Sequence, residues 1–242
     1  MKYFELTCTA YIKKDITFTE SFEILSTYIS YSMMRDTKLK ALHHSSGYKY
    51  YVFGGLLPIE RAGIYTKGNT YKFVIRSLDE SFVDTLSKTL RENIDNPHLL
   101  IVETHKKPIK QFFVSELYSA TPVIVSLQGS DRFWTKEDDL MLLHKQLQEN
   151  LEKKYQEFYD KPIESSQSFI QLFELKNNRL QTIQTNKTHS DGSPVKFYGN
   201  KFRIVPNEDE VSQKLAFVAL ACGLGEKNSF GGGFCLGKGM RV

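Results

Sequence analysis

The sequence of 242 residues has little cysteine and no long apolar run. Its 3 cysteines, Cys8, Cys222 and Cys235, lack the short spacing of metal-ligand pairs, so we expect reduced thiols in a cytoplasmic protein. No apolar stretch reaches the roughly 18 residues of a membrane span. The N-terminus enters a strand pattern at once, so no signal peptide is expected.

Motifs for metal and for open-sheet RNA binding are also missing. The sequence contains no His-Glu-x-x-His, no paired cysteines and no clustered carboxylates, so we expect neither a metal nor a cofactor. The single tryptophan, Trp134, precedes a helix pattern and is interpreted as a packing anchor. The basic, glycine and aromatic signature of RNA-recognition strands does not occur, which argues against base stacking on an open sheet.

A strong excess of one charge is absent as well. The 32 Lys and Arg residues outnumber the 28 Asp and Glu residues by only 4, and the isoelectric point is about 8.7. This mild excess is compatible with RNA binding without demonstrating it. A hydrophobic fraction of 40% suits an ordinary soluble protein, and 242 residues are enough for one large domain or two smaller ones.

The first half of the chain reads as strand, helix, strand, strand, helix, strand, which is the ferredoxin-like order. The helices are expected to begin at Thr19 and at Asp79, where capping residues precede apolar stripes. The strands show alternating or β-branched patterns and are expected at Lys2–Ala10, Tyr50–Phe53, Tyr71–Ile75 and Leu99–Glu103.

The same order then begins again. A strand at Pro122–Leu127 and a long helix with its stripe from Leu140 to Phe158 are followed by a strand at Phe169–Leu175. Val195–Tyr198 and Phe202–Val205 read as a hairpin, before a fourth helix. We therefore predict two tandem ferredoxin-like (RRM-like, βαββαβ) domains, residues 1–120 and 121–242, with a C-terminal glycine-rich loop.

That loop holds seven of the 15 glycines, between Gly223 and Gly239. Glycines allow positive φ and close approach of the backbone, and Lys227, Lys238 and Arg241 lie beside them. Exposed amides next to basic side chains would suit a phosphate group.

Two nucleotide-binding motifs fit the loop poorly. A dinucleotide fingerprint requires a strand before the glycines and a helix after them, whereas here a helix precedes them and Asn228 replaces the third glycine. Gly232–Lys238 matches seven positions of a P-loop, yet Gly239 replaces the magnesium-binding hydroxyl and only three residues follow. A flexible turn is the remaining simple interpretation.

The run Gly-Leu-Gly-Glu-Lys-Asn-Ser-Phe-Gly-Gly-Gly-Phe, from Gly223, resembles the C-terminal loop of CRISPR-associated endoribonucleases that process precursor CRISPR RNA. These enzymes belong to the RAMP superfamily, and tandem ferredoxin-like domains are typical of them. Leu42-His43 followed by Gly47-Tyr-Lys49 is similar to the region where the family carries its catalytic histidine and lysine.

The resemblance implies a site in each half. Catalysis would involve His43, Lys49 and Tyr28, with His44 and Tyr31 as alternatives to the histidine and the tyrosine. Histidine titrates near neutral pH and suits proton transfer, whereas lysine supplies positive charge. RNA would contact the second half through the glycine-rich loop and the predicted hairpin, at Gly223, Gly225, Lys227, Asn228, Ser229, Gly231, Gly233, Lys196, Lys201 and Arg203. Lys187 belongs to the same basic patch around the hairpin.

The implied function is metal-independent cleavage of CRISPR repeat RNA. The 2′-hydroxyl would attack phosphorus, leaving a 2′,3′-cyclic phosphate and a 5′-hydroxyl. This cleavage would produce mature crRNA for antiviral defence. The expected partners are RNA, subunits of a CRISPR effector complex and a second copy of the chain in a homodimer. Binding to a membrane is not expected. A non-catalytic RAMP subunit that only binds guide RNA is the alternative, and a nucleotide-binding enzyme is the third hypothesis.

Overall fold

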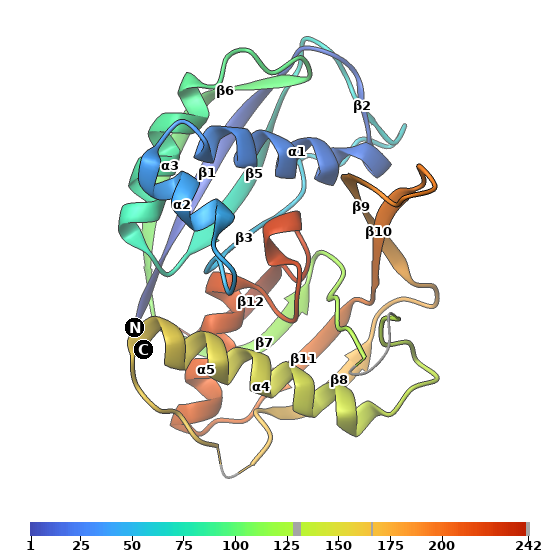
Figure 1. The fold of residues 1–242 in the computed structure, drawn as a ribbon. Coiled ribbons are helices and arrows are strands. Elements are labelled where there is room, and N and C mark those ends of the chain that lie inside the picture. Colours follow the sequence, from blue (N-terminus) through green and yellow to red (C-terminus); the bar gives the residue numbers. More distant parts are fainter. Residues whose placement is uncertain (128–131, 166, 241–242) are drawn as a thin grey trace.

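Two four-stranded antiparallel sheets form the frame of the molecule (Figure 1). The structure is a computed structural model, and it describes residues 1–127, 132–165 and 167–240.

The first sheet has the order β3-β5-β1-β6. Its strands are β1 (Lys2–Ile12), β3 (Tyr51–Phe53), β5 (Thr70–Ser77) and β6 (Leu99–Lys110). The helices of this half are α1 (Phe18–Met33), α2 (Thr37–His44) and α3 (Glu80–Glu92). A separate two-stranded ladder joins β2 (Ile16–Thr17) to β4 (Ile64–Tyr65).

The second sheet has the order β12-β7-β11-β8. Its strands are β7 (Phe113–Ser119), β8 (Ile170–Leu175), β11 (Phe202–Pro206) and β12 (Cys235–Met240). The helices are α4 (Leu140–Tyr159), α5 (Glu210–Cys222) and the short 3₁₀ turn η1 (Asn228–Phe230). A hairpin of β9 (Gln181–Thr188) and β10 (Pro194–Gly199) is inserted between β8 and β11.

Both sheets repeat one strand order. In each, the first strand lies between the third and the fourth, and the second strand forms the far edge. This order, with helices after the first and third strands, is the ferredoxin-like arrangement. The predicted fold class, two tandem ferredoxin-like domains, is confirmed.

The second sheet begins earlier than the sequence suggested. β7 ends before the predicted boundary between residues 120 and 121, yet it pairs with β11 and β12. The predicted strand Pro122–Leu127 is wrong, because this stretch makes only isolated bridges, at Val123, Ile124 and Ser126. Sheet membership therefore changes at Gln111–Phe112, between β6 and β7.

The predicted hairpin of Val195–Tyr198 with Phe202–Val205 is also wrong. β10 pairs with β9, whereas β11 pairs with β7 and β8. Gly199 lies so close to Val123 that a Cβ would be 2.4 Å from its carbonyl oxygen. Asn200 exchanges two backbone hydrogen bonds with Val123, so Gly199-Asn200 connects two sheets instead of closing a turn.

Each half buries its own apolar cluster. In β1, Leu6, Cys8 and Ala10 alternate toward the core with no exposed surface, and α1 covers them with Leu25 and Ile29. α1 begins at the N-cap Thr17, two residues before the predicted Thr19. In the second cluster, Trp134 is 5% exposed and its Nε1 donates to the Asp139 carbonyl, as expected of a packing anchor.

The halves meet along α1, β5 and the C-terminal segment. Arg76 of β5 is buried, donates to Glu5 (2.9 Å) and to the Cys235 carbonyl (2.5 Å), and stacks on Phe234. Figure 1 shows the β9–β10 hairpin rising beside α1, and the two elements are in contact. Segments from both halves thus contact α1, namely α2 from the first half and β9 and η1 from the second.

Candidate functional site

A cleft of about 430 Å³ lies where α1, α2, β9 and η1 converge. The apolar stripe of α1 faces the core, which leaves hydroxyl-bearing side chains of the same helix for the cleft. The first half contributes Ser26, Thr27, Ser30, Tyr31, Met33, Met34, His43, Lys49 and Tyr51, and the second half contributes Asn186, Lys187, Ser229 and Phe230.

His43 lies in the last turn of α2 and lines this cleft. The helix begins at Asp36, whose carboxylate accepts from the amides of Lys38 and Leu39. Burial lowers the pKa of His43, and the electrostatic effects of His44, Lys49 and Lys187 lower it further. The lowered pKa favours the neutral imidazole, which is able to accept a proton. His44, the alternative, is exposed and does not line the cleft.

Lys49 reaches back to the helix that carries His43. Its ammonium donates to the Leu42 carbonyl (2.6 Å), to the Ser45 carbonyl and to Ser45 Oγ (3.1 Å). These acceptors lie at the C-terminal end of α2, where a cation is favourable. Burial lowers the pKa of Lys49. Lys49 lines the cleft, but its three protons already hold the end of α2.

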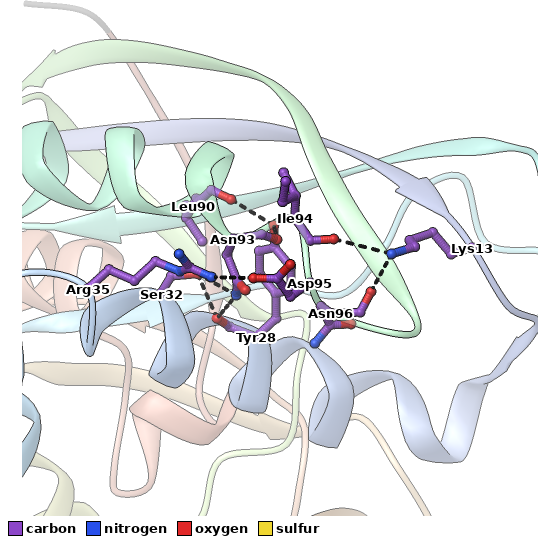
Figure 2. A network of polar contacts seen from close by, with 9 residues as sticks. All are labelled: Lys13, Tyr28, Ser32, Arg35, Leu90, Asn93, Ile94, Asp95 and Asn96. Carbon is purple, nitrogen blue, oxygen red and sulfur yellow. Dashed lines mark hydrogen bonds and ion pairs between the residues drawn. The ribbon is translucent and has the colours of Figure 1, made fainter.

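The prediction that Tyr28 belongs to this site is wrong. Tyr28 has no exposed surface, and its hydroxyl faces the carbonyls of Leu90 (2.7 Å) and Asn93 (2.9 Å) while accepting from the Ile101 amide (3.1 Å). Figure 2 shows Tyr28 with Leu90 and Asn93. Burial raises its pKa to about 12. Tyr31, one helical turn later, is 63% exposed and lines the cleft.

The glycine-rich loop does not form the expected open phosphate cradle. Gly223, Gly225, Gly231 and Gly233 are buried, and all four have positive φ. A Cβ on Gly231 would be 2.5 Å from the Phe22 ring, and one on Gly233 would be 1.9 Å from the Leu224 carbonyl oxygen. The Gly231 and Gly233 amides donate to the carbonyls of Asn228 and Pro122. These glycines permit close packing of the loop between the two halves.

The polar residues of the loop have different surroundings. Asn228 is structural, because its amide donates to the Gly232 carbonyl (2.9 Å) and its Oδ1 accepts from Lys154 (2.8 Å). Ser229 lines the cleft, and its carbonyl accepts from Ser26 of α1. The Lys227 ammonium lies over the Phe197 ring of β10. Lys238 pairs with Glu116 (2.9 Å), and Arg241 lies outside the described residues.

Lys154 of α4 is a residue that the sequence interpretation missed. It is 2% exposed, and its ammonium donates to the carbonyls of Gly223 (2.8 Å) and Gly225 (2.9 Å) as well as to Asn228. Burial lowers its pKa to about 8, so the amine is mainly charged at neutral pH. The signal was its place on the apolar stripe, between Leu151 and Phe158, where a lysine requires buried acceptors.

The four basic residues assigned to the predicted hairpin separate into two groups. Lys187 and Lys196 belong to the observed hairpin β9–β10, where both are exposed. Lys201 lies in the link to β11, and burial lowers its pKa. Arg203 lies on β11 itself and pairs with Glu116 (2.6 Å) and Glu174 (3.5 Å). Arg203 is therefore committed to the sheet instead of being available to a ligand.

Two features are absent from the described parts of the chain. Residues 1–127, 132–165 and 167–240 hold no group of three or more His, Cys, Asp or Glu side chains arranged to bind a metal ion. Within the same ranges, no helix has the length and apolar character needed to cross a membrane.

The chain is similar over nearly its whole length to proteins of one kind. It is 24% identical to the CRISPR-associated endoribonuclease Cas6 2 of Methanocaldococcus jannaschii, over 92% of this chain and 94% of that protein. A solved structure described as CRISPR associated protein Cas6 superposes with a TM-score of 0.67 at 18% identity, covering 98% of this chain and 99% of the other.

A second solved structure, described as a RAMP protein binding different RNA substrates, also superposes with a TM-score of 0.67, at 16% identity and with 97% and 99% coverage. The family described as "CRISPR associated protein Cas6, C-terminal" matches residues 102–236, which is more than half of the chain. The chain therefore belongs to the Cas6 family.

Proposed function

We propose that this protein is an endoribonuclease that cleaves CRISPR repeat RNA without a metal ion. The observation that carries the proposal is His43, a half-buried histidine with a lowered pKa in a cleft lined by both halves. Similarity to a protein named as a Cas6 endoribonuclease supports the reaction class.

The proposed reaction uses the 2′-hydroxyl of the RNA as the nucleophile. Neutral His43 takes the proton of that hydroxyl, and the 2′-oxygen forms a bond to the adjacent phosphorus. The bond from phosphorus to the 5′-oxygen breaks, and this oxygen takes up a proton from solvent as it leaves, while His43 afterwards returns its proton to solvent. The products are a 2′,3′-cyclic phosphate and a 5′-hydroxyl.

Other groups of the cleft assist in this scheme. The Tyr31 hydroxyl is exposed in the cleft and can donate a hydrogen bond to a phosphate oxygen. Lys49 positions α2, and with it His43, through the carbonyls of Leu42 and Ser45. Ser30 adds a hydroxyl group that suits ribose or phosphate oxygens.

The test is incubation with repeat RNA in EDTA, with and without a 2′-deoxy substitution at the cut site. Cleavage should persist in EDTA and stop on the 2′-deoxy substrate, and the product should carry a cyclic phosphate. Activity that disappears with the chelator and returns with magnesium would contradict the mechanism. RNA binding without cleavage would leave the alternative, a RAMP subunit that only holds RNA.

A further inference from the structure

Lys187 is a lysine of the cleft whose ammonium the protein does not use. It lies on β9 and is exposed. Lys187 and Asn186 are the hairpin residues that line the cleft. Within the ranges that the structure describes, its ammonium has neither a carboxylate partner nor a hydrogen-bond acceptor. A cation that lines a cleft without a counter-charge is available to an anionic ligand.

Lys49, the other lysine of the cleft, is in the opposite situation. Its three donors are directed at Leu42 and Ser45, and to bind a phosphate it would have to release the end of α2. Such a release would also move His43, which lies in the last turn of that helix. The charge that meets a substrate phosphate should therefore come from elsewhere.

The hairpin that carries Lys187 is fixed against the cleft. Gln184 of β9 donates to Glu23 of α1 (3.2 Å), and Thr185, 3% exposed, donates to the Val195 carbonyl of β10 (3.1 Å). The Lys187 amide donates to the Thr185 hydroxyl (3.2 Å). At the base of the hairpin, Phe197 packs on Phe230 of η1, with ring centroids 5.3 Å apart.

Lys187 and His43 line the same cleft. The charge of Lys187 also contributes to the lowered pKa of His43, after burial, His44 and Lys49. A phosphate bound in this cleft beside His43 would therefore meet a lysine that has no counter-charge.

We propose that Lys187 provides the positive charge that meets the reacting phosphate, so that the site is composite, with its base from the first half and its cation from the inserted hairpin of the second. This proposal rests on the proposed endoribonuclease function. The ammonium would donate to a nonbridging oxygen of the phosphate, whose negative charge increases as the 2′-oxygen bonds to phosphorus. Lys187 would thereby stabilise the transition state more than the bound substrate.

The test is single-turnover cleavage at saturating protein by Lys187→Ala and Lys187→Arg. Lys187→Ala should lower the rate about 10²-fold, the usual loss on removing one transition-state donor, and Lys187→Arg should retain most of the rate. The matched control is Lys88→Ala, which removes an exposed lysine from α3, outside the cleft, and should cleave like the wild type.

A second readout needs no RNA. Histidine titration by NMR should show a higher pKa of His43 in Lys187→Ala than in the wild type, and no change in Lys88→Ala. An unchanged His43 pKa in Lys187→Ala would overturn the proposed placement.

The outcomes separate the two proposals. A wild type that cleaves, with Lys187→Ala equally fast at saturation, would overturn the role of Lys187 and leave the endoribonuclease intact, even if that variant bound RNA more weakly. A wild type that binds repeat RNA without cutting it would overturn both.

Discussion

Tyr28 and Tyr31 lie one turn apart on α1 and have opposite surroundings. The Tyr28 hydroxyl is engaged with three backbone groups in the core, whereas the Tyr31 side chain is 63% exposed in the cleft. Tyr28→Phe should lower the free energy of unfolding by about 1–3 kcal/mol, because buried polar groups lose their partner. Tyr31→Phe should leave stability within about 0.5 kcal/mol.

The two substitutions should have the opposite effects on the cleavage rate. Tyr31→Phe should slow single-turnover cleavage, and folded Tyr28→Phe should cleave at the wild-type rate. Denaturant unfolding and single-turnover kinetics on both variants check this pair. A slow, stable Tyr28→Phe variant would return that residue to the reaction.

The lowered pKa of His43 fixes the direction of a pH dependence. A general base acts in its neutral form, so the cleavage rate should increase with pH through the pKa of His43 and then level off. Because that pKa lies below the ordinary value of about 6.5, the plateau should already be reached at neutral pH. Single-turnover rates between about pH 4.5 and 8 measure the profile. A rate that decreases as pH increases through the acidic range would show that the protonated form is required.

At the scale of elements, the glycine-rich loop is held by one lysine of α4. Lys154→Met would leave the carbonyls of Gly223 and Gly225 without their donor. Each buried acceptor left unpaired costs about 1–3 kcal/mol, so we expect a loss of about 3 kcal/mol in the free energy of unfolding. The neighbouring Lys153 is exposed, and Lys153→Met should change stability by less than about 0.5 kcal/mol. Equal small effects in denaturant unfolding would contradict the assigned role of Lys154.

Two substitutions in the glycine-rich loop should distinguish a role in packing from a contact with RNA. Gly231→Ala places a Cβ against Phe22 at a φ of 91°, and should cost roughly 2–4 kcal/mol of stability without altering the salt dependence of RNA binding. Lys227→Ala removes a charge and should reduce the salt slope by about one unit for one lost phosphate contact. Binding titrations at several salt concentrations check both. A flatter slope in Gly231→Ala would restore the phosphate-cradle interpretation.

The order of elements could be predicted from the sequence because it depends on local periodicity. The stripe of α4 and the alternation of β1 are visible in the residues themselves. The partner of a strand is not local information. β10 and β11 are adjacent in sequence yet join different sheets, since Gly199 and Asn200 pack on the distant Val123.

For the site, too, only features that are local in the sequence could be predicted. His43 and Lys49 lie close together in the sequence, and their shared environment could be predicted. Helical spacing places Tyr28 on the flank of the apolar stripe and Tyr31 nearly opposite it, but only the Leu90–Asn93 segment shows that the Tyr28 hydroxyl is engaged in the core. Lys187 was visible in the sequence as part of a basic patch, but its place in the cleft depends on a hairpin that lies far from His43 along the chain.

At the scale of the whole molecule, the proposed reaction takes place in one cleft formed by the two halves, where His43 moves a proton. The measurement that tests this most directly is single-turnover cleavage of repeat RNA in EDTA by the wild type, His43→Ala and His44→Ala, with RNA affinity measured in parallel. His43→Ala should cleave about 10²–10⁴-fold more slowly with nearly unchanged affinity, and His44→Ala should remain close to the wild type. A His43→Ala variant that cleaves at the wild-type rate would contradict the account.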